Sequence, residues 1–254
     1  MRTLLLVLFT GIFLGSAWQL FSTQEEYQES QNSYSVLDQY ISIPDPTTEV
    51  IVDTTSATIP TEPDAEDNTV WPVVDFEALQ EINPDIVGWI YIEGTEISYP
   101  IVQGEDNSYY LKHLFDGTYN SSGCVFLDAA SSDDFSDFNN IIYGHNMKNG
   151  TMFHALMNYK EQQFYDEHPV ALLLTPSQNY KIMLFSGYVA SNSDNAWQTD
   201  FTASSYVQWL SEITGESCLE AEVSPTEDDI ILTFSTCSYE FSNARFVLHG
   251  IIAW

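Results

Sequence analysis

Near its C-terminal end the chain contains the stretch Ile231-Leu-Thr-Phe-Ser-Thr-Cys237-Ser-Tyr-Glu-Phe-Ser-Asn-Ala-Arg245-Phe-Val-Leu-His-Gly250. Two apolar, β-prone runs are separated by a short polar turn, which predicts two adjacent strands. The first run leads into Cys237, and the second opens with Arg245. Arg2 and Arg245 are the only arginines in the chain. The sequence therefore predicts a thiol at the end of one strand and a guanidinium at the start of the next.

The chain is strongly acidic. Its 254 residues include 37 Asp and Glu against 6 Lys and Arg, which gives a formal net charge of -31. A phosphate backbone would be repelled and no basic stripe is present, so we expect no nucleic-acid partner. Solubility explains the acidity most simply, and recruitment of a cationic partner or Ca²⁺ is the alternative. We expect no metal ion and no cofactor, and we expect the acidic loop Asp133-Asp134-Phe-Ser-Asp137 to be solvated. Binding of Ca²⁺ by this loop is the alternative.

Three cysteines are present, at positions 124, 218 and 237. An odd count leaves at least one thiol free. We expect Cys124 and Cys218 to be small buried side chains, and a disulfide between them is the alternative.

The N-terminal segment is apolar. Leu4 to Phe21 follows Arg2 and has about the length that a membrane-spanning helix needs. We therefore expect residues 1–23 to form a single-pass anchor in the cell membrane, with a cytoplasmic N-terminus and an extracellular remainder. A cleaved signal peptide is the alternative, because residues 15–17 resemble a small-residue cleavage site.

The remainder divides into a polar region and a folded domain. Residues 24–75 are expected to be a polar stalk followed by an acidic, Pro/Thr-rich spacer, and residues 76–254 the domain. The longest helix of the domain is expected at 201–213, before the strand that carries Cys237. Few, short helices between many strands favour a mostly β barrel or sandwich over a doubly wound sheet. Strands are expected at residues 86–92, 97–102, 123–127, 140–143, 170–174, 181–189, 230–235 and 245–252.

Cys237, His145 and Arg245 are each expected at the end of a strand. Together they would supply a nucleophile, an acid/base and an electrophile. In cysteine acyl transfer the thiolate attacks a carbonyl, an imidazolium protonates the leaving amine, and fixed donors stabilise the oxyanion. Each residue taken alone has a structural role as the alternative, so the hypothesis depends on the combination.

The motifs around these residues belong to a wider pattern. Thr233-Phe-Ser-Thr-Cys237 is followed by Asn243-Ala-Arg245, and Tyr143-Gly-His145-Asn-Met lies upstream. The pattern resembles that of the class B sortases over residues 76–254. Further segments that fit it are Asn83-Pro-Asp-Ile-Val-Gly-Trp-Ile-Tyr-Ile92, Tyr99-Pro-Ile-Val-Gln103, Asp106-Asn-Ser-Tyr-Tyr-Leu111, Phe115-Asp-Gly117 and Phe164-Tyr165.

The resemblance implies an eight-stranded sortase β-barrel and a membrane-bound cysteine transpeptidase of a Gram-positive cell wall. Such enzymes cleave a C-terminal sorting motif of a secreted protein and hold the product as a thioester. They then pass it to an amine of the peptidoglycan cross-bridge. The resemblance also implies that His145 is the general acid/base, Cys237 the nucleophile and Arg245 the cation that orients substrate or stabilises the oxyanion. The residues that match positions lining the sorting-signal groove are Asn107, Leu111, Tyr143 and Ser235.

Alternatives to an anchoring transpeptidase stay open at this stage. A pilin-polymerising or mainly hydrolytic sortase-like thiol peptidase would use the same three residues with a different acceptor. A non-enzymatic, wall-tethered acidic module with a structural cysteine is the third hypothesis. The chain also departs from the class at Ser238, since members can carry an acidic residue directly after the cysteine.

Overall fold

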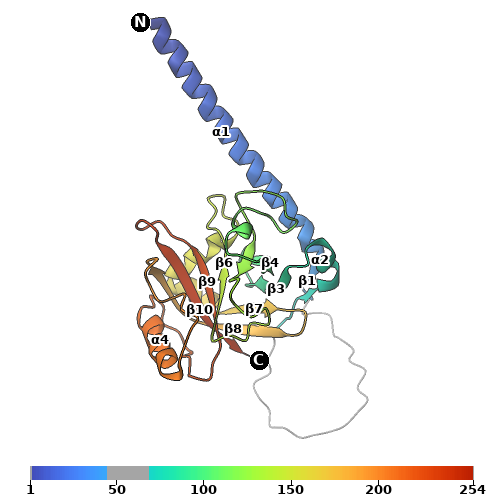
Figure 1. Ribbon diagram of the computed structural model, residues 1–254, viewed down its shortest axis with the longest axis vertical. Helices are drawn as coiled ribbons and strands as arrows, with labels where there is room; N and C mark the ends of the chain where they lie inside the picture. The colour runs from blue at the N-terminus through green and yellow to red at the C-terminus, as the bar shows by residue number, and fades with distance from the viewer. Residues whose placement is uncertain (1, 45–68, 254) are drawn as a thin grey trace.

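The computed structural model of the chain describes residues 2–44 and 69–253, with side chains from Phe9 onward. Most of the predicted acidic spacer, residues 45–68, lies outside the described residues. Eight strands of the described residues close into a barrel (Figure 1), which confirms the predicted mostly β architecture. In chain order the barrel strands are β3 (Ile86–Tyr91), β4 (Ser98–Val102), β5 (Val125–Leu127), β6 (Asn139–Tyr143), β7 (Val170–Leu174), β8 (Asn179–Ala190), β9 (Ile231–Cys237) and β10 (Arg245–Ala253).

The barrel has mixed topology. Its strands follow the order β10-β8-β7-β3-β4-β5-β6-β9, and β9 closes the ring by pairing with β10. The β4–β5 and β6–β9 pairs are parallel, whereas the other neighbours are antiparallel. Because β6 and β9 run in the same direction, the segments that follow them leave the barrel at the same edge.

Alternation along β9 decides which side chains reach the site. Leu232 and Phe234 belong to the apolar cluster inside the barrel, whereas Ile231 packs in a second cluster under helix α4 (Ala203–Gly215). Side chains of a strand alternate between its two faces. Cys237 therefore shares the outer face with Ile231, at the opposite end of β9.

Helix α4 confirms the predicted longest helix of the domain, within two residues at each end. Thr202 and Ser205 form a capping box at its start. Tyr206, Trp209 and Ile213 recur at helical spacing and are buried against the barrel. The other elements among the described residues are α1 (Arg2–Leu37), η1 (Asp38–Tyr40), β1 (Ile41–Ser42), β2 (Val73–Val74), α2 (Phe76–Ile82), η2 (Tyr109–Leu111), η3 (Phe153–Lys160) and α3 (Gln162–Glu167).

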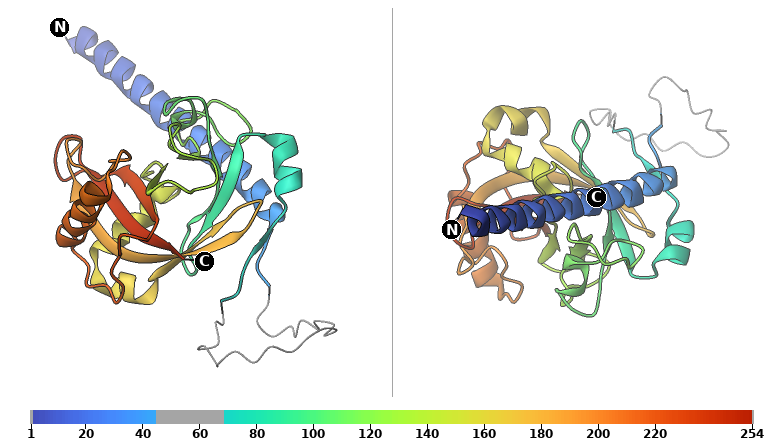
Figure 2. Two further views of the ribbon diagram at one scale, coloured as in Figure 1. Left: turned by 60° about the horizontal axis from the view of Figure 1, so that its bottom comes forward. Right: turned by 90° about the horizontal axis from the view of Figure 1, so that it is seen from above.

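Helix α1 extends away from the barrel, and its C-terminal part packs against it (Figures 1 and 2). The Tyr34 hydroxyl donates to the Gly123 carbonyl at 2.6 Å, and Leu37 is buried. Asn120 Nδ2 donates to the Glu26 carbonyl at 3.0 Å. These contacts attach the polar part of α1 to the loop before β5.

The predicted single-pass membrane localisation is wrong on this structure. Within residues 2–44 and 69–253, no helix combines the length and the hydropathy that crossing a bilayer demands. α1 is long, but polar side chains such as Gln19 and Glu25 interrupt its apolar residues. The described apolar run is therefore shorter than the roughly 20 residues that a bilayer requires.

Candidate active site

Cys237 and Arg245 lie directly opposite each other on neighbouring strands. Cys237 ends β9, Arg245 begins β10, and the antiparallel register pairs the two residues. Residues opposed in this way have Cβ atoms about 4.5–5.5 Å apart, so the thiol and the guanidinium leave the strands side by side. Both residues are half-buried. The loop between them is closed by the Ser238 amide, which donates to the Ala244 carbonyl at 2.9 Å.

His145 reaches the same edge from the parallel neighbour of β9. The β6–β9 register pairs Tyr143 with Ser235, and just beyond it the Gly144 amide donates to the Ser235 carbonyl at 3.1 Å. Gly144 is required here because a Cβ would lie 2.6 Å from the ring of Phe153. The glycine lets the chain turn closely over that ring and places His145 two residues past the end of β6.

The imidazole of His145 is held by η2. Its Nε2 lies 2.8 Å from the Leu111 carbonyl oxygen, which can only accept, so Nε2 carries the proton. The Arg245 Nη1 donates to the Ala244 carbonyl at 3.0 Å. Among the described residues no hydrogen bond joins the side chains of Cys237, His145 and Arg245 to one another. Hydrogen bonds between catalytic groups often tighten only when substrate binds, so this geometry is compatible with joint action.

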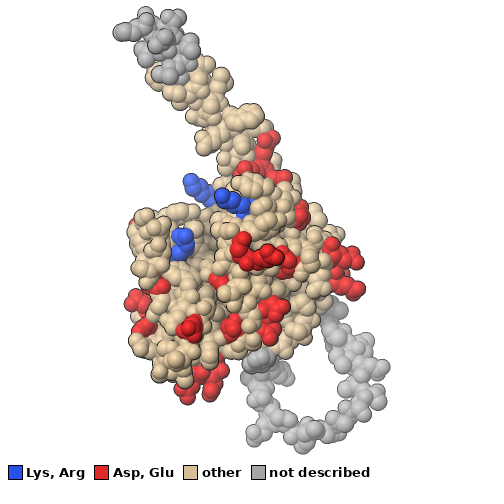
Figure 3. All heavy atoms as spheres, viewed as in Figure 1, with Lys and Arg blue, Asp and Glu red and all other residues tan. Residues whose placement is uncertain are grey.

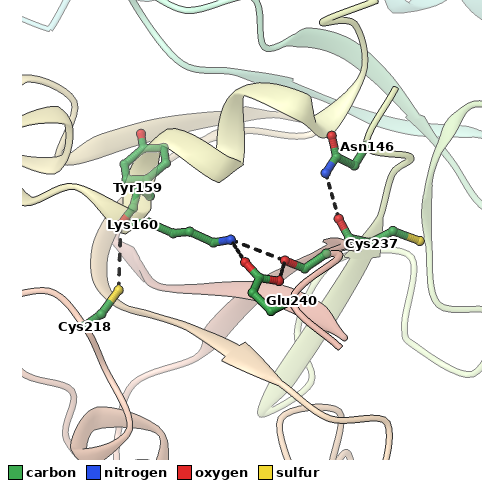
Figure 4. Close-up of polar contacts among 7 residues, drawn as sticks. Asn146, Tyr159, Lys160, Cys218, Cys237 and Glu240 are labelled. Carbon is green, nitrogen blue, oxygen red and sulfur yellow. Dashed lines mark hydrogen bonds and ion pairs between the residues drawn. The ribbon is translucent and has the colours of Figure 1, made fainter. Parts of the chain in front are cut away.

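The backbone of Cys237 is fixed by Asn146. Asn146 Nδ2 donates to the Cys237 carbonyl at 2.9 Å (Figure 4). The figure also shows the sulfur of Cys237 directed away from the neighbouring Lys160–Glu240 pair. The thiol is thus left available at the barrel edge while the main chain behind it is anchored.

Lys160, Ser238 and Glu240 form a polar cluster beside the β9–β10 loop. Lys160, at the end of η3, makes an ion pair with Glu240 and donates to Ser238 Oγ at 3.3 Å (Figure 4). The Ser238 hydroxyl also donates to Glu240. Hydrogen bonds from Lys160 and Ser238 lower the pKa of the Glu240 carboxyl from 4.5 to about 2. Ser238 therefore helps to hold the loop in place, and Glu240 faces Lys160 rather than the thiol.

Positive charge is scarce around this site. Figure 3 shows acidic side chains over much of one face, whereas the few basic ones lie toward the end from which α1 projects. Residues 76–254 contain five basic side chains, and Lys160 is neutralised by Glu240. Arg245 is therefore the cation that lies next to the thiol in an acidic surface. Within the described residues no group of three or more His, Cys, Asp or Glu side chains is arranged to hold a metal ion.

Comparison with known proteins decides the family. No protein-family model matches the chain. Sortase B of Staphylococcus aureus is 36% identical over 168 residues, which cover 66% of this chain and 69% of that protein. Sortase B of Listeria monocytogenes is 31% identical over 244 residues, which cover 94% of this chain and 92% of that protein. The chain belongs to the sortase B family.

Solved sortase B structures agree with this assignment. The Staphylococcus aureus sortase B–substrate complex matches with a TM-score of 0.67 and 36% identity, covering 70% of this chain and 83% of that one. A sortase B structure complexed with triglycine matches with a TM-score of 0.66 and 35% identity, covering 70% and 84%. The resemblance predicted from the motifs is confirmed, and the protein is a sortase-type cysteine transpeptidase.

Two of the predicted groove residues of this sortase share one partner. Asn107 Nδ2 and the Tyr143 hydroxyl both donate to Asp128 Oδ2, at 2.8 and 2.9 Å. Burial, and then the neighbouring Asp128 carboxylate, raise the pKa of Tyr143 well above its usual value. Leu111 is partly exposed, and its carbonyl holds His145. The Asp128 carboxylate thus connects Asn107 to Tyr143, and the Leu111 carbonyl connects η2 to His145. The partners in these contacts lie far apart in the sequence.

The fourth predicted groove residue, Ser235, is covered. It is 3% exposed, and its Oγ accepts from Trp197 Nε1 at 3.0 Å. Trp197, in the β8–α4 connection, is half-buried and lies over the outer face that Ser235 shares with Cys237. The indole of Trp197 therefore covers the outer face of β9 at Ser235, two residues before the thiol.

Several residues of the site were not predicted. Asp128 and Trp197 contact predicted site residues from other parts of the chain, Lys160 contacts Ser238 directly after Cys237, and no local motif marks these three residues. Asn146 had a signal, since it directly follows His145. The cysteine prediction was wrong in part: all three thiols are free and Cys124 is buried, but Cys218 is exposed.

Proposed function

We propose that this sortase cleaves a C-terminal sorting motif of secreted proteins and transfers the acyl group to an amine of the cell-wall peptidoglycan. In this proposal Cys237 is the nucleophile, His145 the general acid/base and Arg245 the cation that orients substrate and stabilises the oxyanion. One observation supports it most: Cys237 and Arg245 are cross-strand partners, and His145 follows the strand parallel to β9 at the same barrel edge.

The acylation step follows from these positions. The Cys237 thiolate attacks the scissile carbonyl carbon, and the carbonyl oxygen becomes an oxyanion that Arg245 N–H groups can bind. Protonated His145 donates its proton to the leaving amine as the C–N bond breaks. The products are a thioester on Cys237 and a free amine from the C-terminal part of the substrate.

Deacylation reverses these roles with a second amine. Neutral His145 removes a proton from the acceptor amine, whose nitrogen attacks the thioester carbonyl. The C–S bond breaks, the thiolate is restored, and a new amide forms. If water attacks instead, the same steps give a carboxylic acid, so acceptor binding decides between transfer and hydrolysis.

The comparisons support the choice of substrates. One sortase B structure to which the chain is similar was solved with a substrate, and a second sortase B structure was solved with triglycine, a peptide with a free amine. The acidic surface of this chain fits a basic acceptor, because opposite charges raise the encounter rate.

The test is a product analysis. The full chain is incubated with a pentapeptide library fused to a reporter, with and without triglycine, and the products are identified by mass. We expect cleavage of a narrow set of peptides and an amide-linked triglycine product that grows with triglycine concentration. Carboxylic acid products alone at every triglycine concentration would support a hydrolytic peptidase instead. No cleavage of any library peptide would contradict the proposal.

A further inference from the structure

Asn146 connects the two predicted reacting groups of the site. It directly follows His145, is 8% exposed, and donates through Nδ2 to the carbonyl oxygen of Cys237 at 2.9 Å (Figure 4). The side chain of the residue after the predicted acid/base is thus hydrogen-bonded to the main chain of the predicted nucleophile. The catalytic roles described above make no use of this contact.

The hydrogen bond between Asn146 and Cys237 lies beyond the end of the β6–β9 pairing. The parallel β6–β9 ladder stops at Tyr143 and Ser235. Beyond it, side chains bridge the two segments: Thr236 Oγ1 donates to the Gly144 carbonyl at 2.8 Å, and Asn146 Nδ2 donates to the Cys237 carbonyl. His145 lies between Gly144 and Asn146, so both of its neighbours are bonded to the strand that carries the thiol.

His154 fixes the orientation of the Asn146 amide. Its Nδ1 lies 2.7 Å from Asn146 Oδ1, and because an amide oxygen only accepts, Nδ1 carries a proton. This leaves the Asn146 amino group facing the Cys237 carbonyl. The main chain of Asn146 is held as well, by a bridge to Met152 and by the Tyr239 hydroxyl, which donates to its carbonyl at 3.4 Å.

We infer that Asn146, oriented by His154, is a positioning residue that sets the separation of His145 from Cys237. The inference rests on the proposed roles of those two residues. Asn146 contacts the main chain of Cys237 and the ring of His154, and its side chain bonds to none of the predicted groove residues. Its loss should therefore reduce the rate of chemistry and leave peptide binding nearly unchanged.

Four variants of the full chain test this inference: Asn146→Ala, His154→Leu, His154→Gln and Asn158→Ala. Asn158 is the matched control, because it is an exposed asparagine of η3 that bonds to Glu161 through its main-chain carbonyl. The kcat and KM are measured with a peptide selected from the library, and the melting temperature is measured in parallel.

The expected pattern separates positioning from a merely structural role. A displacement near 1 Å can lower turnover about 100-fold, and we expect that loss of kcat in Asn146→Ala with KM changed by less than about threefold. His154→Leu frees the amide to rotate and should lower kcat about 10-fold. His154→Gln keeps an N–H donor for Asn146 Oδ1, so it should retain most of the wild-type kcat. Asn158→Ala should match the wild type.

Two results would overturn the inference. Wild-type kcat in Asn146→Ala would show that the bond does not position the thiol. If Asn146→Ala does not fold, equal kcat values in His154→Leu and His154→Gln would exclude orientation by His154. Cys237→Ala distinguishes failure of the positioning role from failure of the proposed function. Full activity in Cys237→Ala would reject Cys237 as the nucleophile, whatever the result for Asn146.

Discussion

Replacing Arg245 with lysine should remove most of the activity and preserve the fold. Arg245 stands opposite Cys237 and already uses one guanidinium N–H on the Ala244 carbonyl, at 3.0 Å. A guanidinium has five N–H donors in a planar fork, so the remaining donors can bind the oxyanion that forms on the substrate carbonyl oxygen when the neighbouring thiolate attacks. A lysine ammonium places all its donors on one nitrogen and cannot occupy both positions in the same geometry.

The size of the effect follows from the loss of one oxyanion donor. Such a loss costs about 2.7–4 kcal/mol of transition-state stabilisation, or about 10²–10³ in kcat. Arg245→Lys keeps the charge, so we expect the lower limit of about 10²-fold. Arg245→Ala removes charge and donors together and should reach about 10³-fold.

The assay measures kcat and KM of the full chain with a quenched peptide selected from the library. Lys181→Gln is the matched control for the loss of positive charge in Arg245→Ala, because Lys181 pairs with Ala253 at the other end of β10. Circular dichroism and the melting temperature establish that each variant is folded. A kcat within about threefold of the wild type in Arg245→Lys would refute planar donation by the guanidinium.

Three further predictions concern stability. Gly144→Ala places a Cβ 2.6 Å from the Phe153 ring and should cost about 1–3 kcal/mol in urea unfolding, whereas Gly215→Ala, with open space around its Cβ, should not. The pKa of Glu240 is lowered to about 2, so its ion pair should raise the free energy of unfolding of the wild type over that of Glu240→Gln by less than about 1 kcal/mol. This difference should be present above pH 4.5 and vanish toward pH 2. A difference that persists at pH 2 would contradict the prediction. Burial lowers the pKa of His249 from 6.5 to about 3, so below pH 6.5 the unfolded chain binds a proton that the folded chain does not. The free energy of unfolding should therefore keep its full value from this residue above pH 6.5 and fall toward pH 3 by at most about 1.4 kcal/mol per pH unit. If the free energy of unfolding of His249→Gln fell equally steeply in acid, the prediction would be wrong.

Local patterns predicted the elements that carry the reacting groups. The two apolar runs around Cys237 and Arg245 fold as β9 and β10. The predicted first strand, residues 230–235, ended two residues too early. Cross-strand pairing with β10 extends β9 to Cys237, and polar residues such as Thr236 remain in the sheet because their main chains bond to the partner strand.

Contacts between distant segments could not be predicted from the sequence. Lys160 and Glu240 are 80 positions apart, and neither lies in a motif that identifies the other. The same holds for Asn107 and Tyr143, which meet on Asp128. Such pairs depend on how the strands close into a barrel, and alternation and turn signals describe only neighbours in the chain.

The N-terminal prediction failed for a different reason. Apolar composition identified a helix correctly, and α1 covers Arg2–Leu37. The described apolar run of α1 is interrupted by polar side chains such as Gln19 and Glu25 before it reaches the roughly 20 residues that a bilayer requires.

The proposed function requires that Cys237 carry the substrate as a thioester. The most direct test adds hydroxylamine to the full chain and a cleavable peptide, and also maps the acylated enzyme by mass spectrometry after rapid quenching. We predict one acyl group on Cys237, a peptide hydroxamate as product, and neither in Cys237→Ala. An acyl group on Cys218 or any other residue, or undiminished hydroxamate formation in Cys237→Ala, would contradict the account.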